Sequence, residues 1–468
     1  MATNHKMPFM LDKKEIVLIK PSSPTPSHVL SLSTIDNTNH LEVLCQTMHV
    51  YQANIKYPNG NNNHESILSS HSDPVCVIKE ALSRVLVHYY PLAGKLKRHS
   101  DGKLRINCNA DGVPFLEATA TCDLSSLHYF DGVDVETAKH FVTDFPTRPD
   151  DEGYHPLVIQ VTKFSCGGFT IGMGLSHSVC DGFGAAQFFR ALAELASGKG
   201  EPSVKPVWER ERLLGSPNNG LIQFLVDQAS CANSPYFPVT DMIHECFNVK
   251  SESLKRLKNN LMKASDDNNS FTVVEALGAY IWRSRVRALE LNPDGKTVFF
   301  LALGIRKLLN PPLPDGYYGN AFVSSIVVLN GRDLDEGPLS KVASLIRESK
   351  EIASNNEYIL KELNLLETIR ELKIETDNKS GAAAVLTDWR RLNLMGEVDF
   401  GWKGAVNIIP LPWNIDGYVD LNLLLPPFSL DETMEGGVRV FVALPRAAMA
   451  KFKEEMSALE LGDGHALI

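Results

Sequence analysis

The length of the chain sets the first limit on its fold, because 468 residues are more than one hydrophobic core usually holds. Hydrophobic residues make up 44% of the sequence and charged residues 22%. This composition supplies enough apolar surface for sizeable cores and argues against general disorder. Strand-like and helix-like segments follow one another in irregular order, so we expect a mixed α/β fold in two layered halves.

One segment is the best candidate for a connection between domains. The sequence turns polar over 197–220, where three residues are prolines and several are charged. We therefore expect an N-terminal domain over 1–196, a crossover linker over 197–220 and a C-terminal domain over 221–468. Part of 360–400 is expected to pack with the N-terminal domain.

The spacing of apolar residues predicts individual elements within these halves. Helices are expected over 73–89, 184–198, 272–289, 339–353 and 446–459, and strands over 157–161, 169–175, 297–305, 322–329 and 437–443. The segment Asn310–Asn320 contains three prolines and two glycines, and it must therefore be a shaped loop rather than a regular element.

Charge and targeting signals exclude several classes of protein. The 46 basic and 56 acidic residues give a net charge of −10, which disfavours nucleic acids and anionic membranes as partners. No run of about 18 apolar residues is present to span a membrane, and the N-terminal residues lack the apolar core of a secretory signal. The eight cysteines are widely spaced and expected to be reduced. We expect a cytoplasmic monomer without a metal site.

The segment His177–Gly182 is the first candidate for chemistry. His177 follows a predicted strand, and Asp181 precedes a glycine-containing turn into a predicted helix. A histidine there can act as a general base, while the carboxylate can orient its ring, cap the helix or bind an arginine. Taken alone, His-x-x-x-Asp is a weak pattern, and a structural histidine is its ordinary interpretation. No nucleophile elbow, phosphate loop or metal-binding histidine pair accompanies it, which favours direct transfer over a covalent enzyme intermediate.

Three motifs in the right order make the chain resemble the BAHD acyltransferases of plants. They are His177–Gly182, which matches His-x-x-x-Asp-Gly, then Asn310–Asn320, and then Asp399–Trp402, which begins an Asp-Phe-Gly-Trp-Gly motif. The block Tyr89–Leu96 is also similar to a family block near the N-terminus. One departure is Lys403, which stands where the last motif has its final glycine. If that glycine needs a positive φ, lysine would shift the turn.

The resemblance implies two similar domains of mixed sheet plus helices, like chloramphenicol acetyltransferase, with a channel between them. It implies acyl-CoA as co-substrate and His177 as the base that deprotonates a small-molecule acceptor. Asp181 would orient the site, with Arg306 as the candidate partner. Asp399, grouped with His177 as catalytic, and Trp402 would hold the other side of the channel.

The resemblance also implies substrate contacts. Ser33, Asp36, Thr387 and Trp389 fall where relatives border the acceptor pocket. Ser270, Thr272, Lys255 and Lys258, with Arg256 beside them, fall where relatives contact CoA. The lysines also fit a solvated helix face, and Trp389 also fits a core position.

Transfer of an acyl group to a hydroxyl of a specialised metabolite is the leading expectation, and acetyl or benzoyl donors are favoured. The segments 33–37 and 182–188 look closest to the branch that acylates taxane-like terpenoids and simple alcohols. Acylation of an amine, which the same base could perform, is the first alternative. A catalytically silent family member that acts as a binding subunit is the second.

Overall fold

The computed structural model describes residues 9–53, 73–132, 135–145, 152–220, 227–238, 241–265, 270–374, 380–395, 400, 402, 404–411 and 421–462. Internal contacts divide the chain into two compact units. The first consists of Met1–Leu213, Pro314–Asn320 and Leu392–Asn414, and the second of Leu214–Leu313, Ala321–Arg391 and Ile415–Ile468. The segment expected to be a linker, 197–220, therefore includes the boundary, and two later segments return to the first unit.

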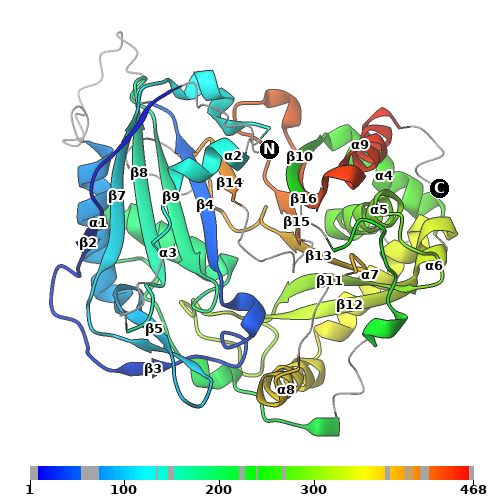
Figure 1. Ribbon diagram of the computed structural model, residues 1–468, viewed down its shortest axis with the longest axis horizontal. Helices are drawn as coiled ribbons and strands as arrows, with labels where there is room; N and C mark the ends of the chain where they lie inside the picture. The colour runs from blue at the N-terminus through cyan, green and yellow to red at the C-terminus, as the bar shows by residue number, and fades with distance from the viewer. Residues whose placement is uncertain are drawn as a thin grey trace. The chain divides into compact units, whose positions relative to one another are not determined.

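The first unit is built on a mixed sheet of seven strands in its described part (Figure 1). The strand order is β1 (Leu11–Lys13), β7 (Val113–Ala120), β8 (Leu157–Phe164), β9 (Phe169–Ser176), β4 (Leu44–Tyr51) and β14 (Asn407–Pro410), and β2 (Val17–Ile19) also pairs with β7. Only β7 and β8 run parallel among these pairs. A smaller sheet contains β3 (Val29–Ser31), β6 (Leu104–Asn107) and β5 (Lys95–Arg98).

Two long helices of the first unit, α1 (Pro74–His88) and α3 (Gly182–Ala196), pack against each other. Asp73 begins α1 by accepting a hydrogen bond from the Val75 amide at 3.0 Å, and the proline at the first helical position needs no amide partner. The apolar faces of both helices join strand residues in one core, to which Leu82 and Phe189 belong. A short helix, α2 (Val135–Ala138), completes the unit.

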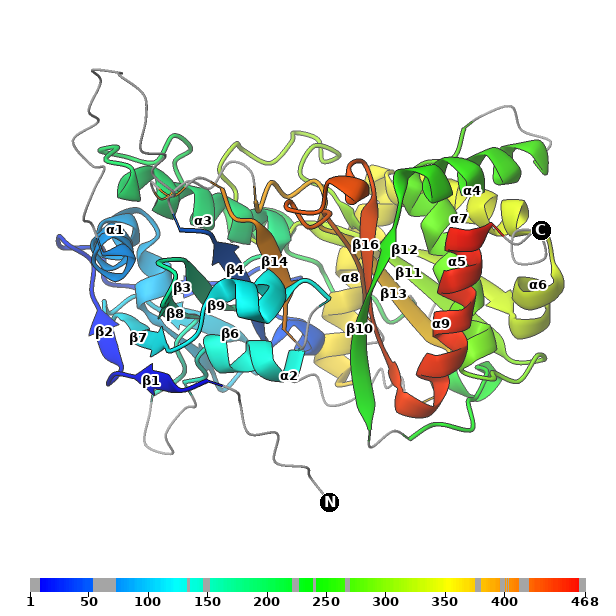
Figure 2. The ribbon, with the colours of Figure 1, turned by 90° about the horizontal axis from the view of Figure 1, so that it is seen from above.

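The second unit contains a six-stranded sheet in its described part. The strand order is β10 (Met242–Val249), β16 (Val438–Pro445), β15 (Leu421–Leu425), β13 (Ala383–Asp388), β11 (Lys296–Gly304) and β12 (Phe322–Asn330). Its helices are α4 (Ser251–Lys263), α5 (Val273–Ala288), α6 (Gly331–Glu336), α7 (Leu339–Ala353), α8 (Asn356–Leu372) and α9 (Arg446–Leu461). Figure 2 shows α5, α7 and α9 on one side of this sheet, where they share a core with it.

Helix α5 is the centre of the second core. Nearly all of its residues are buried, and its neighbours are α4, α6, α7 and α9. Its N-terminus is fixed by a reciprocal pair of hydrogen bonds, in which Thr272 accepts from the Glu275 amide and Glu275 accepts from the Thr272 amide.

The mixed α/β fold expected from the sequence is confirmed, and so are the predicted elements named above, within a few residues at their ends. The segment Asn310–Asn320 contains neither a helix nor a strand, as predicted. Strands β4, β13, β14 and β15 and helix α8 were not predicted, and α4 was anticipated only as a solvated helix face around its lysines. Among the described residues, no helix has the length and apolar character needed to cross a membrane.

Candidate active site

His177 lies in a tight turn between β9 and α3. Strand β9 ends at Ser176, whose carbonyl accepts a hydrogen bond from the Val179 amide at 3.0 Å. The His177 amide donates to the Val43 carbonyl at 2.9 Å, which fixes the start of the turn against the residue before β4. The backbone of the histidine is therefore held by the sheet.

Asp181 ends this turn by capping α3. Its Oδ1 accepts a hydrogen bond from the Gly184 amide at 2.9 Å, and its carboxylate stands at the positive end of the helix dipole. The expected partner Arg306 belongs to the second unit, where its carbonyl accepts from the Leu313 amide at 2.9 Å. A pairing of Asp181 with Arg306 stays a prediction.

The end of the predicted loop, Pro314–Asn320, packs on the start of α3. Gln187 donates from Nε2 to the Gly316 carbonyl at 2.9 Å. A Cβ atom added at Gly184 would lie 1.9 Å from the Tyr318 carbonyl oxygen, so the close approach requires glycine there. Two segments more than a hundred residues apart in the sequence are thus held together at the turn 177–181.

Asn320 fixes the tautomer of the His177 ring. The Asn320 Nδ2 group donates to Asp36 Oδ1 at 2.7 Å and to the His177 carbonyl at 2.6 Å, which uses both of its protons. Its Oδ1 lies 3.0 Å from His177 Nδ1 and must accept. The hydrogen-bond network therefore assigns the imidazole proton to Nδ1 and the lone pair to Nε2, the form that a general base requires.

Asp36 in turn holds Asn320. Its Oδ1 also accepts from the Asn320 amide at 3.2 Å, and its Oδ2 accepts from the Ser33 amide at 3.0 Å. Ser33 Oγ accepts from the Asp36 amide at 3.1 Å, so the two residues lock one turn. Both were expected to border the acceptor pocket, but both are completely buried. Their carboxylate and hydroxyl hydrogen-bond inside the protein, and a contact of these residues with an acceptor stays a prediction.

The sequence interpretation did not single out two residues of this network, Asn320 and Arg210. Arg210 Nε lies 3.4 Å from Asp36 Oδ2, and its Nη2 donates to the Val179 carbonyl at 2.7 Å. Only one feature of the sequence pointed to Arg210: it lies two residues after Trp208, in a segment that is otherwise polar and expected to be exposed. For Asn320 the signal was stronger, because it closes the Asn310–Asn320 motif.

The surroundings of His177 keep its imidazole neutral. Burial lowers its pKa, and the opposing influences are a hydrogen bond with its own backbone, the charge of Asp181, the bond to Asn320 and the charge of Asp36. The net shift is downward. At neutral pH the ring is accordingly ready to accept a proton.

The C-terminal motif contributes aromatic residues to the core of the first unit. Phe400 makes edge contacts with Tyr51 and Phe189, with ring centroids 5.7 and 5.5 Å apart. Trp402 packs edge-on against Phe169 at 5.2 Å. Asp399, Gly401 and Lys403 lie outside the described residues. The catalytic assignment of Asp399 and the effect of Lys403 therefore stay predictions.

The other predicted contact residues belong to the second unit. Thr387 lies in β13 opposite Leu423, and the Trp389 amide donates to the Leu424 carbonyl at 2.8 Å, with the indole buried. Lys255 is exposed and Lys258 is half-buried on α4. Thr272 caps α5, and the Ser270 carbonyl accepts from Arg347 at 3.2 Å. Thr272 therefore has a structural role as a helix cap, and Trp389 has one as a buried side chain, whether or not a ligand binds nearby.

Comparison with known proteins supplies the family. A model described as the Transferase family matches residues 9–459. Two curated proteins of Arabidopsis thaliana, a spermidine coumaroyl-CoA acyltransferase and a spermidine sinapoyl-CoA acyltransferase, are 44% and 41% identical to the chain. The alignments cover 97% of this chain in both cases, and 96% and 98% of the two relatives. The chain belongs to the BAHD family of acyl-CoA-dependent acyltransferases.

Two further matches place this BAHD protein within the family. A taxadien-5-alpha-ol O-acetyltransferase of Taxus chinensis is 31% identical over 97% of the chain and 98% of the relative. The solved structure of vinorine synthase has the same fold, with a TM-score of 0.71 and 23% identity over 96% of this chain and 98% of that one. The expected family and fold are thus confirmed.

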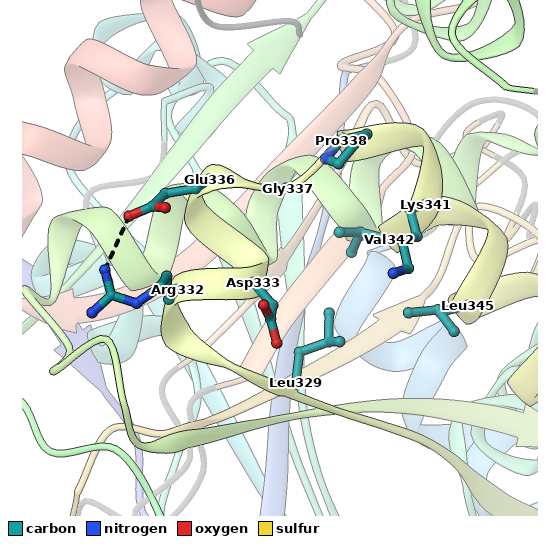
Figure 3. A pocket seen from close by; sticks show the side chains of 9 residues that line it. All are labelled: Leu329, Arg332, Asp333, Glu336, Gly337, Pro338, Lys341, Val342 and Leu345. Carbon is teal, nitrogen blue, oxygen red and sulfur yellow. Dashed lines mark hydrogen bonds and ion pairs between the residues drawn. The ribbon is translucent and has the colours of Figure 1, made fainter.

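A pocket of this BAHD protein belongs to the second unit, remote in the sequence from the turn 177–181 (Figure 3). It has a volume of about 360 Å³ and is bounded by the end of β12, α6 and the start of α7. Leu329, Val342 and Leu345 form its apolar wall. Arg332 on its rim is paired with Glu336 at 3.4 Å. None of the described residues singled out from the sequence lines it.

The geometry of the first unit suits proton transfer. The imidazole of His177 is kept neutral by burial and its tautomer is fixed by Asn320, which is the form in which an imidazole accepts a proton. Within the described residues, no group of three or more histidine, cysteine, aspartate or glutamate side chains could hold a metal ion.

Proposed function

We propose that this protein transfers an acyl group from a CoA thioester to an amine of a polyamine such as spermidine, with His177 as the general base. The observation that supports this most is the imidazole of His177, whose Nδ1 proton is directed to Asn320 so that Nε2 carries the lone pair. The choice of an amine acceptor is supported by the two relatives with more than 40% identity, both named for spermidine.

The proposed reaction needs one proton acceptor and no covalent enzyme intermediate. An alkyl ammonium has a pKa of about 10, so the acceptor nitrogen first loses one proton to solvent and becomes a neutral amine. The amine attacks the thioester carbonyl carbon, and His177 Nε2 takes the second proton from the nitrogen as the C–N bond forms. The C–N bond forms, the tetrahedral oxyanion collapses, and the C–S bond breaks. The proton then passes from His177 to the departing CoA thiolate, which restores the neutral base.

The names of the relatives also favour an aromatic acyl donor of the hydroxycinnamoyl class. They are named for coumaroyl-CoA and sinapoyl-CoA, whereas the sequence alone favoured acetyl or benzoyl donors and a hydroxyl acceptor. That second candidate is supported by the taxadienol acetyltransferase, at 31% identity. Because the same base serves both reactions, the acceptor and the donor must be determined by experiment.

The acceptor is tested with a matched pair of molecules. The purified protein receives coumaroyl-CoA, sinapoyl-CoA, acetyl-CoA or benzoyl-CoA, each with spermidine or with an amino alcohol of similar length. Released thiol and the mass of the product are measured. We expect amides, with the hydroxycinnamoyl donors reacting faster than acetyl-CoA. Ester products alone would show that the acceptor is a hydroxyl.

Substitution of the base tests whether the protein is a catalyst at all. Removal of a general base typically lowers a rate by a factor of about 10² to 10⁴. His177→Ala is therefore expected to lose acceptor-dependent thiol release while its melting temperature stays close to that of the wild type. Equal thiol release from both proteins would favour the alternative of a binding subunit that is catalytically silent.

Several finer assignments belong to the same proposal. Lys255 and Lys258 would bind the CoA phosphates, since α4 carries positive charge at an exposed and at a half-buried position. Ser270 would contact the CoA arm beside them, and Thr387 and Trp389 would border the acceptor. Reversal of charge in Lys255→Glu should raise the KM for the acyl-CoA more than the KM for the acceptor.

A further inference from the structure

Arg210 is a buried cation that the proposed chemistry does not use. Its side chain is 1% exposed, and it begins the short 3-10 helix Arg210–Leu213 at the end of the first unit's main segment. A guanidinium is buried at a high cost in solvation unless it is paired and hydrogen-bonded. The partners of Arg210 therefore indicate its role.

One partner is the catalytic turn itself. Arg210 Nη2 donates to the Val179 carbonyl at 2.7 Å, and Val179 lies midway between His177 and Asp181. This contact is charge-assisted and buried, which makes it one of the stronger bonds to the turn. Arg210 thus acts directly on the segment that carries the base.

The other partner reaches the imidazole through two side chains. Arg210 Nε lies 3.4 Å from Asp36 Oδ2, while Asp36 Oδ1 accepts from Asn320 Nδ2 at 2.7 Å. Asn320 Oδ1 in turn accepts from His177 Nδ1 at 3.0 Å. A continuous chain of polar contacts therefore runs from Arg210 to the ring nitrogen that must keep its proton.

Three aromatic rings fix the plane of the guanidinium. Its central carbon lies 4.3 Å from the ring centre of Trp208, 5.1 Å from that of Tyr317 and 5.0 Å from that of Tyr318. A Cβ atom added at Gly319 would come within 1.1 Å of Arg210 Nη1, so the loop backbone lies directly against the cation. Lysine could carry the charge there but could not reproduce these contacts.

We propose that Arg210 is a positioning residue for His177: it clamps the catalytic turn at Val179 and, through Asp36 and Asn320, holds the imidazole in its base form. This inference rests on the proposed function, since it takes His177 as the base. Under this proposal the segment 207–213, at the end of the longest stretch of the first unit, contributes directly to the geometry of the site. The hydrogen bonds from Val207 to Gly316 and from Thr34 to Leu213, at 2.9 and 3.0 Å, hold that segment in place.

Opposite charges next to His177 make the proposal testable by pH. In the first unit the charged groups near the ring are Asp181 on α3, Asp36 in the turn after β3, and Arg210, which neutralises Asp36. The Tyr317 hydroxyl and the thiols of Cys45 and Cys180 lie in the same region, and burial raises the pKa of the Tyr317 hydroxyl and of the Cys45 thiol, so both stay uncharged.

The experiment compares two variants that remove one charge each, Arg210→Met and Asp36→Asn. The acid limb of the pH profile of kcat/KM reports the protonation of His177 in the free enzyme. Loss of Arg210 leaves Asp36 uncompensated and should move this limb to higher pH, whereas Asp36→Asn leaves Arg210 uncompensated and should move it to lower pH. Each shift is expected to be about 0.5 to 1 pH unit. Ionisation of the acceptor is common to all variants and cancels in the comparison.

Two further variants complete the design. Arg212→Met removes a cation two residues away that pairs with Glu209 near the surface, and it should leave the profile unchanged. Arg210→Lys should restore the position of the acid limb but keep kcat at least about fivefold below the wild type, because charge returns without the fork geometry. If Arg210→Met does not fold, Arg210→Lys and Asp36→Asn still decide the matter.

Two results would overturn the inference. One is a wild-type pH profile and kcat in Arg210→Lys, which would make the residue merely a buried cation. The other is a shift of the acid limb in the same direction in Arg210→Met and Asp36→Asn. A failure of the proposed function is read separately, because His177→Ala would then retain thiol release whatever happens at Arg210.

Discussion

Asn320 selects the tautomer of His177 through one hydrogen bond, from the ring Nδ1 to the Asn320 side chain. The free energy that favours this tautomer is therefore that of a single hydrogen bond. A typical intramolecular hydrogen bond contributes about 0.5–1.5 kcal/mol, and about 1.4 kcal/mol corresponds to a factor of ten in rate. Asn320→Ala should therefore lower kcat by about three- to tenfold, far less than His177→Ala, because the ring can still adopt the correct tautomer for part of the time. Steady-state kinetics of thiol release measure the difference.

The matched control for this substitution is Asn109→Ala, which removes an exposed asparagine of the first unit. It should leave kcat unchanged. A loss in Asn320→Ala as large as that in His177→Ala would show that Asn320 does more than orient the ring. A loss in neither kcat nor KM would show that the imidazole is held well enough by its other contacts.

At the scale of elements, Asp181 at the junction of β9 and α3 can have two roles: it can cap the helix, or its charge can pair with an arginine. Two substitutions distinguish these roles. As an N-cap, Asp181 needs only an acceptor oxygen, which asparagine also supplies; loss of a cap to alanine costs about 1 kcal/mol. If capping is its main role, Asp181→Asn should keep most activity, while Asp181→Ala should lower both activity and melting temperature. If the charge is needed for a pairing such as that predicted with Arg306, both variants should lose activity equally. Thermal melts and kinetics on the two variants distinguish the cases.

The elements also show what periodicity can and cannot predict. Helix α1 was predictable because its apolar residues recur at helical spacing and Pro91 follows shortly after its end, and strand β9 because its apolar run begins directly after Gly167 and Gly168. Strand β14 is four residues long, so its pattern is too short to read, although its residues are buried against β4. For helix α4 the sequence suggested only a solvated helix face or contacts to CoA at its lysines, because its few apolar positions are spread among lysines and asparagines.

At the scale of the whole molecule, the surroundings of His177 are assembled from segments that are remote in the sequence. The turn at 33–36, the catalytic turn at 177–181, the segment 207–213 and the loop at 316–320 all meet in the first unit. The sequence showed two of these segments, 177–181 and 316–320, as parts of motifs, and the segment 33–36 as similar to relatives. It could not show that Asp36 and Arg210 are paired, because no local pattern encodes a contact between residues so far apart.

The stability of the first unit should depend on pH through a histidine buried in its core. His49 on β4 is completely buried and stacks on Phe189 with ring centres 4.1 Å apart. Burial lowers its pKa to about 3, with a weaker opposing hydrogen bond to the backbone at Leu394. Its unfolded pKa is about 6.5, so below that pH the unfolded chain binds a proton that the folded chain does not. Stability is therefore full above about pH 6.5 and falls as the pH decreases toward 3.

Replacement of this ring by one that cannot titrate removes that dependence. His49→Phe keeps the stacking on Phe189 and should lose about 2 kcal/mol less unfolding free energy than the wild type between pH 6.5 and pH 5, at about 1.4 kcal/mol per pH unit. Urea unfolding at the two pH values measures this, and His28→Phe, at an exposed histidine, serves as the control. Parallel loss of stability in wild type and His49→Phe would mean that other groups cause the acid sensitivity. A smaller loss in His49→Phe alone would show that one neutral histidine in the core sets the acid limit of the fold, separately from the histidine that sets the acid limit of catalysis.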